Sequence, residues 1–365
     1  MNEVRMNKKF FLIVLMSICI FIFFINNYHS EFEYKVYDNS VCITKYLKNK
    51  EIVNIPDYIE GKPVTKIGKN AFSKNREIET NSVIIDFWNL FFYTRKDIKQ
   101  VKFPSMLLEI DSNAFSGNKI KKIEFPSSLI RIGNGAFYGN NIAVINFPNS
   151  IEYIGYKAFS KNEIEDIVLP ENLKIIKLGS FSYNNIKKLE IPSSINIIEH
   201  NAFFESKIEG LKLPKNIDEI GINCFKNNKI KYLELSEGLK IIPSNCFENN
   251  EIKVLKIPNS IEIIEHNAFK NNKIEKIEWS IKVKTIGYES FYNNIITELI
   301  LPNSVISIGK KAFAKNQIEK LVLSNQLKTI YLGAFYDNKI KSLKIPKSVE
   351  FIGFMAFDKN LLKVE

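Results

Sequence analysis

The chain has 365 residues, of which 45% are hydrophobic and 25% are charged, as in an ordinary globular protein. Its formal net charge of +11 favours acidic partners such as anionic glycans or lipid head groups, although lysine is spread along the chain and forms no Lys/Arg-rich block. The four cysteines, at positions 19, 42, 224 and 246, form no C-x-x-C pair, which excludes a zinc or thioredoxin-like site of that type.

The first segment has the pattern of an export signal. Arg5, Lys8 and Lys9 precede an apolar run over residues 10–25 that contains no charge. We predict a signal peptide or a signal-anchor helix over residues 1–30, and the lack of an A-x-A-like cleavage site favours the anchor. Residues 10–25 would then cross the membrane and leave the remainder extracytoplasmic, whereas cleavage would give a secreted protein.

The remainder of the chain is a tandem repeat anchored by phenylalanine. The step is 22 residues throughout the series Phe115, Phe137, Phe159, Phe181, Phe203, Phe225, Phe247, Phe269, Phe291, Phe313, Phe335 and Phe357. Phe72 marks the first copy, and Tyr93 marks a degenerate copy over residues 73–93, where we expect an irregular coil rather than a local binding feature. We predict an N-terminal cap and first coil over residues 31–71, then a solenoid of about 13 to 14 repeats over residues 72–365.

Other residues keep the same register. Ile123 and Phe125, eight and ten residues after an anchor, predict a short strand with both side chains inward. A proline often follows and ends the ladder pairing, and a glycine before several anchors, such as Gly309, predicts a second turn. An asparagine three residues after the anchor is expected to bond turn amides in a structural ladder, beside a spine of the anchor rings. The ladder residues are Asn118, Asn140, Asn162, Asn184, Asn228, Asn250 and Asn272, with Phe115, Phe137, Phe159 and Phe181 in the spine.

These units predict the fold class. One coil cannot bury its own apolar face, so coils must stack on each other. We therefore expect a β-rich, helix-poor solenoid on the order of 65 Å long, preceded by the N-terminal membrane or signal helix. A parallel β-helix is the alternative.

The repeat resembles the BspA-like class of bacterial leucine-rich repeats. The motif I-x-x-L-x-I-P-x-S-I-x-x-I-G-x-x-A-F-x-x-N is illustrated by residues 142–162, IAVINFPNSIEYIGYKAFSKN, and the likeness covers roughly residues 34–365. Residues 34–72 resemble the usual opening cap of that family. The resemblance implies a leucine-rich-repeat solenoid and a surface protein that adheres to other proteins, cells or matrix.

The outward strand positions, seven and nine residues after each anchor, form the candidate contact face. They are mixed in character and show no focused carboxylate pair or metal cluster. We therefore expect no catalytic, cofactor-binding or metal-binding residues, and His200 and His266 lie three coils apart, too far to share a metal. The candidate contact residues are Lys122, Glu124, Lys188, Glu190, Lys212, Tyr232, Glu234, Lys256, Lys276 and Glu278.

Cys224 and Cys246 lie one repeat apart, each just before its anchor. We expect small buried residues there rather than a disulfide, because in-register side chains stay near strand spacing; their oxidation state is left open.

The expected function is non-enzymatic adhesion or binding at the cell surface or after secretion. The partner would be a protein or glycan, with an anionic ligand favoured by charge, and nucleic acid is not expected because lysines commonly alternate with glutamates. The alternative is a structural spacer or self-assembling module without a specific ligand. That alternative includes end-to-end self-association through an uncapped last coil.

Overall fold

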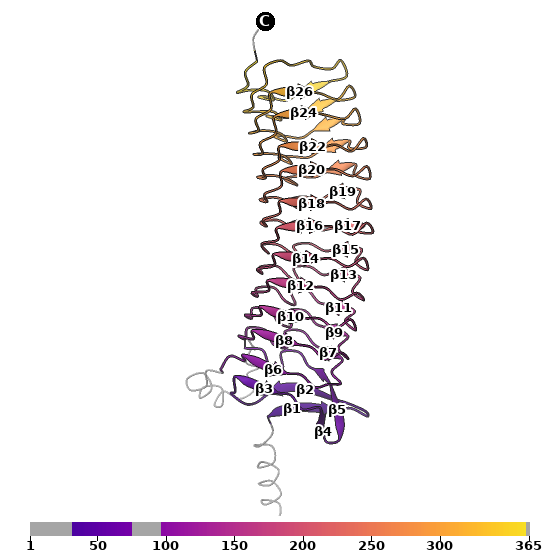
Figure 1. The fold of residues 1–365 in the computed structure, drawn as a ribbon, viewed down its shortest axis with the longest axis vertical. Helices are drawn as coiled ribbons and strands as arrows, with labels where there is room; N and C mark the ends of the chain where they lie inside the picture. The colour runs from indigo at the N-terminus through magenta and orange to yellow at the C-terminus, as the bar shows by residue number, and fades with distance from the viewer. Residues whose placement is uncertain (1–30, 75–95, 363–365) are drawn as a thin grey trace, which may run out of the picture.

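The computed structural model describes residues 31–74 and 96–362 as one elongated stack of coils (Figure 1). Each coil has three sides, which we call the long-strand row, the short-strand row and the turn face. Strands of neighbouring coils pair in parallel and in register, in twos along the long-strand row, as β8 does with β10 through Ile123 and Ile145, and in longer runs along the short-strand row. Within the described residues every regular element is a β-strand, which confirms the predicted β-rich solenoid.

The long-strand row consists of three-residue strands whose middle side chain points inward. In β8 the outer residues Lys122 and Glu124 are exposed while Ile123 is fully buried, because successive side chains of a strand point to opposite faces. The members are β3 (Ile52–Asn54), β6 (Gln100–Lys102), β8 (Lys122–Glu124), β10 (Val144–Asn146), β12 (Asp166–Val168), β14 (Lys188–Glu190), β16 (Gly210–Lys212), β18 (Tyr232–Glu234), β20 (Val254–Lys256), β22 (Lys276–Glu278), β24 (Glu298–Ile300) and β26 (Lys320–Val322).

The short-strand row runs beside it and consists of two-residue strands that bury their second residue along most of the row. The members are β7 (Glu109–Ile110), β9 (Arg131–Ile132), β11 (Tyr153–Ile154), β13 (Ile175–Ile176), β15 (Ile197–Ile198), β17 (Glu219–Ile220), β19 (Ile241–Ile242), β21 (Ile263–Ile264), β23 (Thr285–Ile286), β25 (Ser307–Ile308), β27 (Thr329–Ile330) and β28 (Phe351–Ile352). The last, β28, leaves both of its side chains exposed.

The turn face carries the anchor phenylalanines and bonds each coil to the next. Phe115 N donates to Ala136 O at 2.8 Å, and Phe137 N donates to Ala158 O at 2.8 Å. Residues two before and two after the anchor have positive φ, as in Asn223 at 57° and Asn227 at 58° around Phe225. Asparagine and glycine are frequent at these positions because they tolerate the left-handed region better than other residues.

The anchor rings form a continuous spine inside the rod. Phe115 and Phe137 have ring centroids 5.3 Å apart and nearly parallel planes, and the same stacking recurs down to Phe335 and Phe357 at 5.2 Å. Every anchor from Phe72 to Phe335 is fully buried. Large aromatic areas are thereby removed from water once per coil, as the sequence predicts.

A second, shorter aromatic column lies against the first. Phe103, Phe125 and Phe147 pack edge-on to spine rings, for example Phe103 to Phe115 at 5.6 Å and 89°. Aliphatic residues take this position in the following coils until Trp279, which packs on Phe291 at 5.7 Å. The core therefore contains a second column of aromatic rings only near the N-terminal end, apart from the single ring of Trp279.

The N-terminal cap closes one end of the stack. β1 (Phe32–Val36) pairs antiparallel with β2 (Val41–Tyr46), which pairs parallel with β5 (Lys62–Ile67). A short strand, β4 (Tyr58–Ile59), folds back antiparallel onto β5. The antiparallel β1 covers the end of the first coil, so that coil does not present a bare parallel edge.

The degenerate copy predicted over residues 73–93 lies almost entirely outside the described residues, so its expected irregular coil is not tested, but the anchors on either side of it are described. Phe72 stacks directly on Phe115 with ring centroids 4.7 Å apart, and β5 pairs with β7. No coil therefore lies between these two anchors, although their separation in sequence is close to two repeats. Residues 75–95, with Tyr93, lie outside the described residues and amount to almost one repeat length.

The N-terminal prediction falls outside the described residues. Residues 1–30, with the apolar run over residues 10–25, are not described, and the signal or anchor helix stays a prediction. In residues 31–74 and 96–362, no helix is long and apolar enough to span a membrane.

The glycine before the anchor has a different role from the predicted turn. Gly309 has no positive φ, but a Cβ at this position would come within 2.6 Å of the Gly287 backbone in the preceding coil. Glycine is therefore used here for close approach of two coils rather than for a left-handed turn.

A proline interrupts the short-strand row. In most other coils the residue four before the anchor donates its N–H to the preceding coil, as Gly221 N does to Ile198 O at 2.7 Å. Pro243 occupies this position and has no N–H to donate. β17 and β19 are not paired, and the row is divided there, as it is also divided between β11 and β13, where Lys177 stands at the same repeat position.

The spine predicts a stability difference between buried and exposed positions. Phe225→Ala removes a fully buried ring and should lower the free energy of unfolding by about 3–5 kcal/mol, because a cavity remains between two stacked neighbours. Val168→Ala, at an exposed strand position, should change it by less than about 0.5 kcal/mol. Urea unfolding followed by circular dichroism measures both values, and equal losses would contradict a packed spine.

Candidate contact face and asparagine ladder

The asparagines three residues after each anchor connect neighbouring coils. Asn140 Nδ2 donates to Phe115 O at 2.9 Å and to Phe137 O at 3.1 Å, and its Oδ1 accepts the Ile120 N–H at 3.1 Å. Each side chain thus satisfies two carbonyls and one amide that belong to two successive coils. The described coils that repeat this pattern contain Asn118, Asn140, Asn162, Asn184, Asn228, Asn250, Asn272, Asn294, Asn316, Asn338 and Asn360.

One coil lacks the asparagine. Ser206 stands three residues after Phe203, at the ladder position, and its hydroxyl donates to Phe181 O at 3.1 Å. The Ser206 N–H donates to Asn228 Oδ1 at 3.2 Å, and the following Lys207 has a φ of 65°. The shorter side chain therefore preserves the link to the preceding coil with a local change of backbone.

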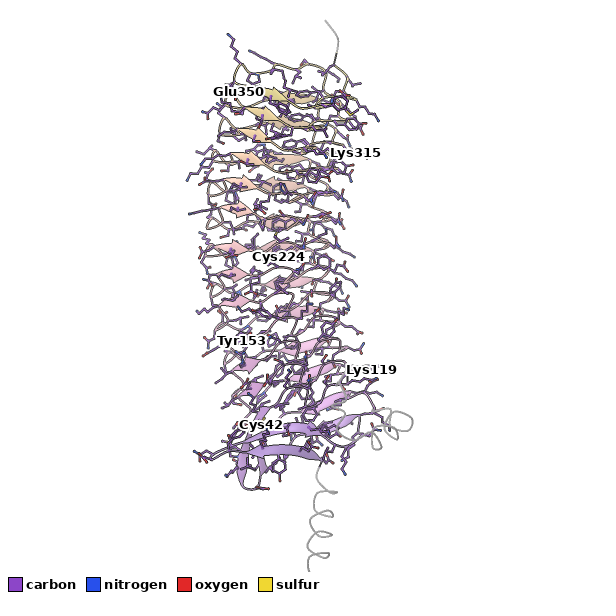
Figure 2. The ribbon with its side chains drawn as sticks, turned by 180° about the vertical axis from the view of Figure 1, so that it is seen from behind. Cys42, Lys119, Tyr153, Cys224, Lys315 and Glu350 are labelled. Carbon is purple, nitrogen blue, oxygen red and sulfur yellow. The ribbon has the colours of Figure 1, made fainter. Side chains whose placement is uncertain are left out.

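The predicted contact residues all lie on the outward side of the long-strand row, which we call the contact face. All are exposed except Glu234, which is half-buried. Figure 2 shows that side chains project from both edges of the rod, with Lys315 and Lys119 on one edge and Glu350 and Tyr153 on the other.

Several charges of the contact face pair with each other. Lys212 and Glu234 on neighbouring strands are 3.0 Å apart, and within single strands Lys122 contacts Glu124 at 2.6 Å and Lys276 contacts Glu278 at 3.3 Å. In the described part of the chain, no ion pair involves Lys188, Glu190 or Lys256. These exposed pairs contribute little stability, since solvent screens them.

The pairing shifts the pKa values of the groups involved. A hydrogen bond from Lys122 lowers the pKa of Glu124, and bonds from Lys212 and Tyr232 lower the pKa of Glu234. The bond to Glu234 raises the pKa of the Tyr232 hydroxyl. Hydrogen bonds and charges of exposed neighbours cause these shifts, as in ordinary surface ion pairs.

Sequence reasoning missed the apolar members of the contact face. Val168 is 71% exposed on β12, and the other exposed apolar side chains of this face share the outward strand positions. They are Val144, Val254, Ile300 and Val322. The signal was present in the sequence, because these residues occupy repeat positions that carry Lys or Glu in other coils.

Shallow hollows lie over three interruptions of the strand rows. A hollow of about 530 Å³ lies beside Val144 and Val168, and one of about 570 Å³ surrounds Tyr232. A third, of about 640 Å³, lies at the break caused by Pro243. The first two belong to the contact face, where β10 and β18 are not paired with the strand that follows.

The histidines and cysteines of the described repeats have structural roles. His200 Nδ1 accepts the Ile222 N–H at 2.8 Å, and His266 Nδ1 accepts the Tyr288 N–H at 3.0 Å. Cys224 and Cys246 are fully buried and free, and burial raises the pKa of both thiols. Among the residues described, no three His, Cys, Asp or Glu side chains are grouped to hold a metal ion.

A buried carboxylate on the turn face is held by two donors. Glu289 accepts from Lys270 Nζ at 2.6 Å and from the Tyr288 hydroxyl at 2.6 Å. Burial raises the pKa of Glu289, but the two hydrogen bonds outweigh it and the pKa lies below its ordinary value. The same bond raises the pKa of Tyr288 to about 12.

Loss of a ladder asparagine should destabilise the rod. Asn250→Ala removes the partner of the buried Ile230 N–H and of the Phe225 and Phe247 carbonyls. We expect a loss of about 1–3 kcal/mol in the free energy of unfolding, since buried polar groups are left unpaired. Asn185→Ala is the matched control, because no side-chain hydrogen bond of Asn185 occurs among the described residues. Similar unfolding midpoints in urea for the two variants would contradict the ladder.

The Tyr288–Glu289 contact predicts a pH dependence at alkaline pH. A raised folded-state pKa contributes stability that is present below pH 10 and is lost as the pH rises through about 12. Glu289→Gln removes the charge and should move the Tyr288 titration down toward 10. The difference in tyrosinate absorbance between each protein and its Tyr288→Phe counterpart isolates this residue. Glu278→Gln, at an exposed position, should leave the difference titration where it is.

The sequence and the fold both match known proteins. The family described as BspA type leucine rich repeat region (6 copies) matches over residues 44–164, 86–209, 174–294 and 240–363. A leucine-rich repeat protein from Bacteroides ovatus has a TM-score of 0.63 and 22% identity, over 90% of this chain and 91% of that chain. A leucine rich cell surface protein from Faecalibacterium prausnitzii has a TM-score of 0.53 and 20% identity, over 92% of this chain and 94% of that chain.

At these identities the two structures support the fold alone. A comparison with curated proteins gives no match. The family match, however, extends over almost all of the repeats and agrees with the spine and ladder. The chain therefore belongs to the BspA-type leucine-rich repeat family.

Proposed function

We propose that this protein is a non-enzymatic binding protein of the cell surface, or a secreted one, that recognises a protein or glycan through the contact face. The surface location is supported by the predicted export signal and by the Faecalibacterium prausnitzii structure, which is described as a cell surface protein. Membrane attachment through residues 10–25 is part of the proposal.

The observation that carries the proposal is the exposure of apolar side chains on a regular strand surface. Val168, Val254 and Ile300 are each at least half exposed to water, although the rod has ample interior for such residues. Groups of exposed apolar side chains bordered by charges are typical of interaction surfaces. Lys212, Glu234 and their neighbours supply that polar border and would orient the partner.

The shape of the rod supports a contact function as well. A solenoid offers one extended surface with a side chain of each coil at a fixed spacing of about 4.8 Å. A partner can therefore contact several coils at once, and each contact adds to the affinity. Catalysis would instead require groups within hydrogen-bond reach of each other in a defined pocket.

A binding screen with a combined variant tests this function. The full chain is screened on immobilised glycans and matrix proteins, and each ligand retained is tested again with a variant that carries Val168→Asp, Val254→Asp and Ile300→Asp. Loss of three exposed apolar contacts should weaken binding by roughly tenfold or more.

The matched control places the same changes on the short-strand side of the rod, as Ile130→Asp, Ile241→Asp and Ile306→Asp, where the side chains are also exposed. It should bind as the unmodified chain does. Equal weakening by both variants would remove the contact face from the proposal, and no binding to any ligand would favour a spacer without a specific partner.

A further inference from the structure

One hollow of the contact face surrounds Tyr232. It lies between β18 and β20, which pair with β16 and β22 respectively but not with each other. The hollow has a volume of about 570 Å³, which is large enough for a short saccharide or peptide segment and too small for a folded domain.

An apolar platform occupies its centre. The Tyr232 side chain is 62% exposed, and Val254 stands at the same repeat position of the next coil. Leu213, Leu235 and Pro258 are largely buried and line the same hollow. The Tyr232 hydroxyl donates to Glu234 at 3.1 Å, and this bond fixes the orientation of the ring.

The rim is positively charged. Four lysines and three glutamates line the hollow: Lys215, Lys231, Lys253 and Lys256, with Glu234, Glu237 and Glu278. Lys212 is engaged by Glu234, and Lys231 lies 3.9 Å from Glu209. Within the described residues, no carboxylate lies in ion-pair distance of Lys215, Lys253 or Lys256, so three ammonium groups are available to a ligand.

We propose that this hollow is a subsite for an acidic polysaccharide. A pyranose ring would pack its apolar C–H face on Tyr232 and Val254, and its carboxylate or sulfate groups would pair with Lys215, Lys253 and Lys256. The inference rests on the proposed function and names the ligand class of the same face. A polysaccharide fits better than an acidic peptide, because the central platform is a single ring with apolar neighbours in a shallow, open hollow.

A repeating acid also matches the regular spacing of the rod. Lys253 and Lys256 belong to one coil, whereas Lys215 belongs to a coil two steps away, roughly 10 Å along the axis. A chain with an acid group on successive sugars can reach both positions at once. Binding of this kind weakens as salt rises, because salt screens exposed charges over about 8 Å at physiological ionic strength.

The test uses the full chain and four probes: heparin, polygalacturonate, dextran and poly-glutamate. At physiological salt, heparin or polygalacturonate should bind, dextran should not, and poly-glutamate should bind more weakly than either acidic polysaccharide. The two acidic probes distinguish sulfate from carboxylate recognition.

Three variants locate the site. Tyr232→Ala and Lys256→Glu should each weaken the acidic polysaccharide by roughly tenfold, since a stacking surface or a charge-assisted contact is lost. Tyr232→Phe should bind as the unmodified chain does, because the ring is retained. Lys102→Glu is the matched control: it makes the same charge change at the same repeat position, on β6, about 34 Å away.

The outcomes separate this inference from the proposed function. If an acidic polysaccharide binds but Tyr232→Ala and Lys256→Glu have no effect, the subsite is wrong while the binding function stands. Tighter binding of dextran or poly-glutamate than of both acidic polysaccharides would overturn the ligand class. If the ligand found in the wider screen is a protein that binds the Tyr232→Ala and Lys256→Glu variants as well as the unmodified chain, the inference fails and the proposed binding function remains. Failure of every probe and every ligand of that screen would remove both.

Discussion

The structure depends on the pairing of backbone groups between neighbouring coils on the turn face. Each ladder asparagine, such as Asn140, bonds carbonyls and an amide of two successive coils, and each anchor N–H donates to the next coil. A single coil would leave these groups without their partners in the next coil, and a buried backbone group without a hydrogen bond costs free energy. Stacking is therefore a requirement of every coil, and the stacked Phe rings add the hydrophobic part of the same contact.

This constraint decides where function can lie. The inward positions of both strand rows and of the turn face are committed to packing or hydrogen bonding, so variation is tolerated at outward strand positions. Most charges there are neutralised by neighbours, as in Lys212 with Glu234 and Lys320 with Glu298 at 2.5 Å. The exposed valines and the lysines without an ion pair around Tyr232 are not neutralised or covered in this way. They distinguish this rod from a solenoid whose outward side chains contact only water.

The coils depart from the regular repeat at three places. At two of them one hydrogen bond of the repeat cannot be made, and at the third the sequence between two stacked anchors is longer than one repeat. Pro243 has no N–H for the preceding coil, and the short-strand row is divided at that point. Ser206 is too short to make all three ladder bonds, and the backbone at Lys207 adapts. Phe72 stacks directly on Phe115, although almost two repeat lengths of sequence separate them. Each irregularity is local, since every coil contacts only its neighbours.

The sequence by itself determined the period, the inward residues and the family of the fold, because a strict repeat gives each side chain the same neighbours in every coil. The ladder role of Asn118 and its counterparts follows from that register alone. Only the tertiary structure decided that Phe72 and Phe115 stack directly on each other, because their separation of almost two repeat lengths, with Tyr93 between them, predicts a further anchor in the spine. The tertiary structure alone also placed Tyr232, Val254 and three unpaired lysines around one hollow, since these residues come from different coils and meet only when the coils stack.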